Sequence, residues 1–118
     1  MTYRIIGLAM HVHRRLGPGL LEKFYESCLC YELSRNDIPF RRQVTIQVAY
    51  EGVPLEAAYV ADIIVAEQVI LKIKAVETIL PVHKYQLLTY MRLLPCRLGL
   101  LLKFNTPSLT DGIRRCIL

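Results

Sequence analysis

Residues 59–76 read YVADIIVAEQVILKIKAV, two apolar runs separated by the dipeptide Glu67-Gln68. Runs of this length that are rich in valine and isoleucine predict two β-strands, Tyr59–Ala66 and Val69–Val76, joined by a tight turn. Because nearly every position is apolar, we expect both to be central strands of a sheet that is covered on both of its faces.

Three charged residues interrupt these strands: Asp62, Lys72 and Lys74. Side chains alternate along a strand, so Lys72 and Lys74 share one face. If the turn places Val65 opposite Val69, then Asp62 lies opposite Lys72. Buried ionised groups are costly unless they are paired or bound to a ligand. The strands alone are compatible with a structural ion pair, in which the lysine stems snorkel, and with a functional polar cluster.

The rest of the chain alternates between helical and extended patterns. We therefore predict one α/β or α+β domain over residues 1–118, with a mixed central sheet flanked by helices. The elements expected around the two central strands are helices at Thr2–Leu16 and about Leu20–Arg35, a half-buried strand at 43–50, a helix at about Val82–Leu94, a strand at Arg97–Phe104 and a short final helix or strand.

The second helix has apolar residues at helical spacing. We expect it to bury Leu21, Phe24, Cys28 and Tyr31, with Leu33 at the margin. Tyr25 is interpreted as a packing aromatic, and Glu26 as a solvated partner of a surface base.

Composition excludes several classes of protein. With 53% hydrophobic and 21% charged residues, the chain is too apolar to be disordered, and no apolar run is long enough to cross a membrane. The net charge of +5 suits a polyanionic partner such as nucleic acid. The four cysteines form no CxxC pair, which favours buried thiols in a reducing cytoplasm over zinc ligands or disulfides.

Several separated motifs resemble one known family. They are VHRRLGPG at 12–19, GLLEKFY at 19–25, KAVE at 74–77, PVH at 81–83, QLLTY at 86–90 and GIRR at 112–115. The chain is identified by them as similar to the GxxExxY proteins of the PD-(D/E)xK nuclease-like superfamily. This resemblance implies a restriction-endonuclease-like core and hydrolysis of phosphodiester bonds in DNA or RNA with Mg²⁺ or Mn²⁺.

The resemblance also implies roles for individual residues. Asp62 matches the metal-binding aspartate, and Lys74 matches the catalytic lysine of the E-x-K element. Glu22 matches a helical glutamate that adds a metal contact, and Gln86 matches a glutamine on the following helix that lines the same catalytic site in related nucleases. The same helical face carries two further residues expected to line the site, His83 and Tyr90.

One position departs from the family pattern. The family has glutamate two residues before the lysine, whereas this chain has Lys72. We expect the Lys72 ammonium to lie near the usual metal position, to donate to Asp62 and Glu22, and to lower the pKa of both acids. Glu67 and Glu77 are substitutes for the missing carboxylate only if the chain bends.

Two functions remain open at this stage. One is a divalent-metal-dependent nuclease impaired by Lys72. The other is a catalytically inactive nucleic-acid-binding or regulatory module on the same fold. Either way, nucleic acid is the expected partner, with Lys72 and Lys74 as contacts, and a homodimer has no support in the sequence.

Overall fold

Three helices lie close to where the sequence pattern predicts them. In the computed structural model, which describes residues 1–55 and 59–118, they are α1 (Thr2–Leu16), α2 (Glu22–Arg35) and α3 (Pro81–Leu93). The first matches its prediction, the second begins at Glu22 rather than Leu20, and the third begins at Pro81, a residue whose fixed φ suits the first turn of a helix. α1 ends directly before the turn Gly17-Pro18-Gly19, whose first glycine caps the helix.

The strands form one mixed sheet, as predicted. They are β1 (Phe40–Tyr50), β2 (Val53–Val65), β3 (Val69–Lys74), β4 (Leu98–Lys103) and β5 (Ile113–Ile117), and a short 3₁₀ helix η1 (Leu109–Gly112) precedes the last. Their order in the five-stranded sheet is β1-β2-β3-β4-β5. β3 and β4 are parallel because α3 carries the chain back between them, and the other neighbouring pairs are antiparallel.

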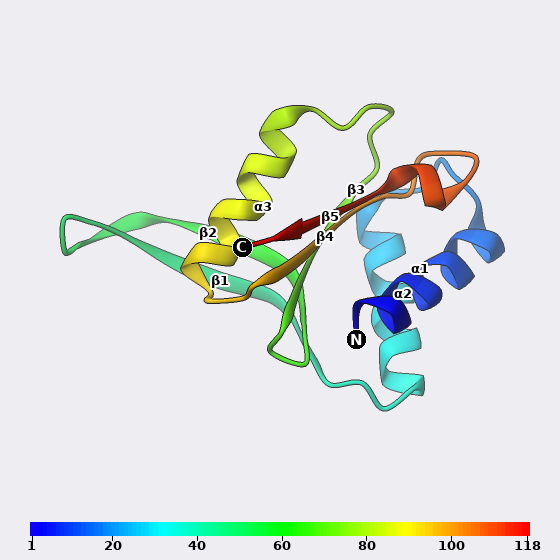
Figure 1. The fold of residues 1–118 in the computed structure, drawn as a ribbon, viewed down its shortest axis with the longest axis horizontal. Coiled ribbons are helices and arrows are strands. Elements are labelled where there is room, and N and C mark those ends of the chain that lie inside the picture. Colours follow the sequence, from blue (N-terminus) through cyan, green and yellow to red (C-terminus); the bar gives the residue numbers. More distant parts are fainter.

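The β1–β2 hairpin is longer than the pattern predicts. Its strands pair as far as Tyr50 and Val53, and its outer part extends away from the helices (Figure 1). The prediction missed the start of β2 because Pro54 and the charged residues nearby give a weak strand signal. β3, by contrast, is shorter than predicted, because it ends at Lys74 and not at Val76.

Helices cover both faces of the sheet. α1 and α2 lie on one side and α3 on the other (Figure 1). In β2, Ile63 and Val65 pack in the α1–α2 core, whereas Ile64 packs in the α3 core. β3 divides in the same way, with Leu71 on the first side and Ile70 on the second. The expectation of central strands covered on both faces is therefore confirmed.

The buried face of α2 differs from the prediction. Leu21, Phe24 and Tyr31 are exposed and Cys28 is half-buried. Leu33 is buried as expected, and the helix also buries Tyr25, Glu26, Leu29 and Cys30. Tyr25 stacks on Phe104 with ring centroids 4.4 Å apart, which confirms its role as a packing aromatic. The prediction was wrong because α2 carries apolar residues on two sides, and packing against the sheet selects one of them.

The four cysteines are free thiols, and the expectation that they are buried is confirmed for three of them. Cys30, Cys96 and Cys116 are buried, and Cys28 is half-buried. Separately, none of the helices described here has the length and apolar character needed to span a membrane.

Candidate functional site

The candidate site lies where β2 and β3 stop pairing. Val65 faces Val69 across the turn, as the expected register requires, and the ladder continues only to Ile63 and Leu71. The next residues along the two strands are Asp62 and Lys72. The two charged residues therefore lie side by side at the point where the strands separate.

Asp62 bridges this separation with its carboxylate. The backbone N–H of Ile73 donates to Oδ2 of Asp62 at 2.8 Å. If the antiparallel register continued, Ile73 would face Ala61, so the carboxylate stands in for a strand partner. The other oxygen, Oδ1, lies 3.6 Å from Nζ of Lys72, and the two side chains are only 15% and 14% exposed.

Glu22 approaches the same strand end from α2. It is the first residue of that helix, and its Oε1 accepts the backbone N–H of Ala75 at 3.1 Å. Asp62 and Glu22 therefore bind the N–H groups of alternate residues, one on each side of Lys74. The structure thus brings together the two acids that the sequence placed in one site.

The pKa of Asp62 is raised from its ordinary value of 3.8, chiefly because burial disfavours the ionised form. The Ile73 N–H and the Lys72 ammonium act in the opposite direction, and the nearby carboxylates of Glu26 and Glu22 raise the pKa further. The expected lowering effect of Lys72 on this pKa is confirmed, but the net shift is upward because desolvation outweighs the ion pair.

Aromatic rings lie beside the ion pair. Nζ of Lys72 is 5.8 Å from the ring centroid of Tyr90 on α3, which is within the range of a cation–π contact. Tyr90 in turn contacts Tyr59 of β2, with ring centroids 5.5 Å apart. This places Tyr90 beside Lys72, while Tyr59 was not expected from the sequence.

Glu26 was interpreted as a solvated partner of a surface base. The pairing with a base is confirmed, because Glu26 binds the exposed Arg42, but the solvated position is wrong. Glu26 is buried, and its carboxylate accepts hydrogen bonds from Nε of Arg42 at 2.6 Å and from Nε2 of Gln43 at 2.7 Å. Arg42 also donates to Oγ of Ser27. The position of Glu26 one helical turn after Glu22 is the signal that could have placed it near the site.

The other candidates are less closely tied to Asp62. Gln86 is exposed, and among the described residues no hydrogen bond joins it or Lys74 to Asp62, so their roles in the site stay predictions. Nδ1 of His83 accepts the backbone N–H of Leu80, which caps the start of α3. The suggested substitute Glu67 is engaged elsewhere, in an exposed pair with Arg41.

The residues present do not fit a divalent metal ion. Mg²⁺ requires oxygen ligands, usually one or two carboxylates together with waters. Here the ammonium group of Lys72 lies 3.6 Å from Oδ1 of Asp62, so a metal ion bound to that carboxylate would meet a competing positive charge, and Glu26 is paired with Arg42. Within residues 1–55 and 59–118, no three acidic, histidine or cysteine side chains are grouped to hold a metal ion.

Comparison with known proteins places the chain in a family. Residues 1–116 match a family model described as the PD-(D/E)XK nuclease superfamily. No curated protein and no solved structure matches the chain. The narrower likeness to the GxxExxY proteins rests on the quoted motifs alone. The match covers nearly all of the mixed sheet and its helices, and the chain therefore belongs to the PD-(D/E)XK nuclease superfamily.

Proposed function

We propose that this chain binds nucleic acid through its nuclease fold and that Lys72 keeps its metal-dependent cleavage weak or absent. Membership of the superfamily supports a nucleic-acid substrate class, and the net charge of +5 supports attraction to a polyanion. The observation that carries the proposal is the contact between Nζ of Lys72 and Oδ1 of Asp62.

A fixed ammonium group opposes a metal ion at this position. At about 4 Å and an effective dielectric constant of about 20, one positive charge repels Mg²⁺ by roughly 8 kcal/mol. The negative charges of Asp62 and Glu22 offset part of this repulsion, and each of these carboxylates also accepts a backbone N–H group. Lys72 therefore replaces a carboxylate ligand with a competing cation.

The lysines of β3 and β4 support binding to phosphates. Lys74 faces Lys103 in the parallel register, and Lys72 lies two residues before Lys74 on the same face. All three are only partly buried. A backbone phosphate can be held by such ammonium groups without any metal ion.

The test is to restore a carboxylate with Lys72→Glu. In this variant the E-x-K pattern returns, so we expect Mg²⁺ or Mn²⁺ affinity to rise by at least about tenfold, together with a higher melting temperature in the presence of the metal. Calorimetric titration and thermal melting measure both effects, and a plasmid-nicking assay measures cleavage. Circular dichroism first checks that the variant folds.

Lys84→Glu is the matched control, because it makes the same charge change at an exposed position of α3. It should leave metal affinity unchanged. Strong Mg²⁺-dependent cleavage by the unmodified chain would overturn the proposal, as would a Lys72→Glu variant that folds and binds no more metal than the unmodified chain.

A further inference from the structure

The outer side of α2 carries apolar side chains that are exposed or only half-buried in the described part of the chain. Leu21, Phe24, Cys28 and Tyr31 follow one another at helical spacing, and their opposite side holds the residues that pack against the sheet. Phe24 is 54% exposed and Tyr31 is 62% exposed. Helices that are apolar on both sides are usually buried on both sides. In α2 only the side that faces the sheet is buried, so its outer side is suited to a binding partner.

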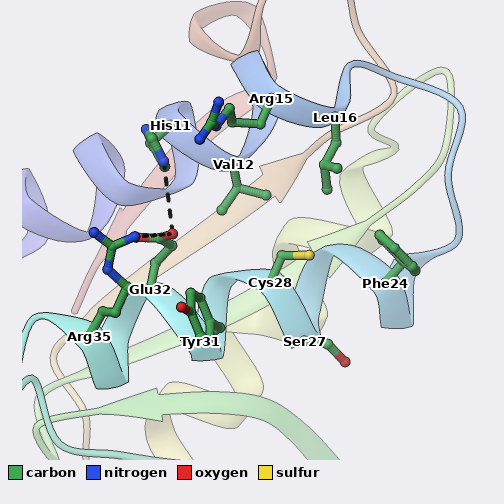
Figure 2. Close-up of a pocket in the computed structure, with 10 residues that line it drawn as sticks. All are labelled: His11, Val12, Arg15, Leu16, Phe24, Ser27, Cys28, Tyr31, Glu32 and Arg35. Atoms are coloured by element: carbon green, nitrogen blue, oxygen red, sulfur yellow. Dashed lines mark ion pairs between the residues drawn. The ribbon is translucent and has the colours of Figure 1, made fainter.

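These side chains border a groove between the two helices of this layer. α1 contributes Val12 and Leu16, and α2 contributes Phe24, Cys28 and Tyr31 (Figure 2). The groove has a volume of about 500 Å³, within the range of sites that bind ligands or side chains. Neither Asp62 nor Lys72 lines it, so it is separate from the candidate functional site.

The rim of the groove is predominantly basic. Arg15, Arg35 and His11 lie along it, with Glu32 as its acidic residue (Figure 2). The Glu32 carboxylate already lies 3.9 Å from Nη1 of Arg35 and 3.8 Å from Nε2 of His11. The net electrostatic potential along the rim is therefore positive, which favours an occupant with negative charge.

We propose that this groove binds an amphipathic helix of a partner protein that presents an apolar stripe flanked by acidic residues. The groove runs between two neighbouring helices, so a third helix can place its apolar side chains at every third or fourth residue into the groove. A second copy of this chain is disfavoured as occupant because it would bring the same basic rim. Acidic side chains at the flanks would reach Arg15 and Arg35.

The test uses two synthetic, covalently stapled helical peptides of about 15 residues that share one leucine stripe. One has glutamates at the flanking positions and the other has lysines. We expect the acidic peptide to bind the full chain at least about tenfold more tightly than the basic one. Isothermal titration calorimetry measures both affinities.

Cys28 provides a second readout at the groove itself. It is half-buried while the other three thiols are buried, so a thiol reagent under native conditions should label it first. The acidic peptide should slow this labelling. Binding without protection of Cys28 would place the peptide elsewhere and overturn the assignment of the groove.

Substitutions separate the apolar and charged contributions. Tyr31→Ala should weaken acidic-peptide binding about tenfold, whereas Tyr85→Ala, at a tyrosine of similar exposure on α3, should not. Arg15→Glu should reverse the preference between the peptides. All these residues are exposed, so the variants are expected to fold.

Three results would overturn the proposal. The first is no binding of the acidic peptide at about 1 mM, a concentration at which even weak helix–groove contacts are measurable. The second is a concentration-dependent dimer that Tyr31→Ala dissociates, which would identify a second copy as the occupant. The third is binding to phosphatidylserine vesicles that depends on Tyr31 while the acidic peptide does not compete, which would identify a lipid surface.

Discussion

At Asp62, one carboxylate oxygen accepts the N–H of Ile73 and the other faces the ammonium of Lys72, so the ionised form has two favourable partners. Burial nevertheless raises its pKa above 3.8. The folded protein therefore holds the Asp62 proton more tightly than the unfolded chain does. As the pH rises from the pKa of the unfolded chain to that of the folded protein, ionisation of Asp62 reduces the free energy of unfolding.

Asp62→Asn should remove this pH dependence. The free energy of unfolding of the variant, relative to the unmodified chain, should increase from about pH 3.5 to about pH 7, because only the unmodified chain pays for a buried charge at the higher pH. Urea unfolding at the two pH values measures the difference. A relative decrease would mean that Lys72 dominates and that the pKa is lowered. As a control, Lys72→Met should raise the Asp62 midpoint further in a carbon-detected NMR titration.

Two glutamate–arginine ion pairs, one buried and one exposed, allow a matched comparison of their contributions to stability. Glu26 has a side chain 5% exposed and bonds Arg42, whereas Glu67 has a side chain 66% exposed and bonds Arg41. Glu26→Ala leaves Arg42 and Gln43 without their acceptor and should cost about 2 kcal/mol of unfolding free energy. Glu67→Ala should cost less than about 1 kcal/mol, because solvent screens that pair. Equal losses in chemical denaturation would contradict this account.

Among the elements, the connection between α1 and α2 and the first turn of α2 carry the GLLEKFY motif at 19–25, in which Gly19, Glu22 and Tyr25 each have a structural task. Gly19 has a φ of 97°, a region that side chains with a Cβ rarely adopt. The hydroxyl of Tyr25 donates to the carbonyl of Gly17 at 2.6 Å and accepts the N–H of Leu20 at 3.1 Å. This turn sets the start of α2 and therefore places Glu22 at Ala75.

Two glycine substitutions should act in opposite directions. Gly19→Ala should lower the free energy of unfolding by about 1 kcal/mol or more, since alanine is strained at positive φ. Gly7→Ala lies inside α1, where an added Cβ meets nothing within 4 Å, and should raise it by about 0.5 to 1 kcal/mol. Thermal and urea unfolding measure both. A stabilised Gly19→Ala variant would show that the turn does not require this backbone conformation.

For the whole molecule, the sheet separates two surfaces of different character. The Lys72–Tyr90 contact lies on the α3 side, whereas the apolar groove lies on the outside of the α1–α2 layer. The proposed nucleic-acid contacts and the proposed helix contacts can therefore be altered independently.

Nucleic-acid binding by a chain of net charge +5 should weaken steeply with salt. Each phosphate neutralised contributes about −0.9 to the slope of log affinity against log salt concentration on duplex DNA, so Lys74→Ala should make the slope shallower by about that amount. Lys23→Ala, at an exposed lysine of α2, is the control and should change little. Fluorescence anisotropy over a salt series measures both.

No affinity at low salt, or an affinity that salt does not change, would contradict nucleic-acid binding by this fold. The groove between α1 and α2 would then be the remaining candidate for function, because its proposed partner is a protein helix.

The sequence by itself determined the features that depend on short separations along the chain. Periodicity placed the helices and central strands, and the tight turn set the register that brings Asp62 beside Lys72. The turn places two valines opposite each other, and the register that follows from this pairing sets Asp62 across from Lys72. The substitution of lysine for the expected glutamate was visible as a residue identity alone.

Only the tertiary structure decided which groups from distant segments meet. Glu22 reaches Ala75 across 53 residues, and Glu26 reaches Arg42 of β1. The sheet selected the Tyr25 side of α2 over the Phe24 side, although both are apolar. It also decided the pKa of Asp62, because desolvation depends on everything packed around a side chain and not on its neighbours in sequence.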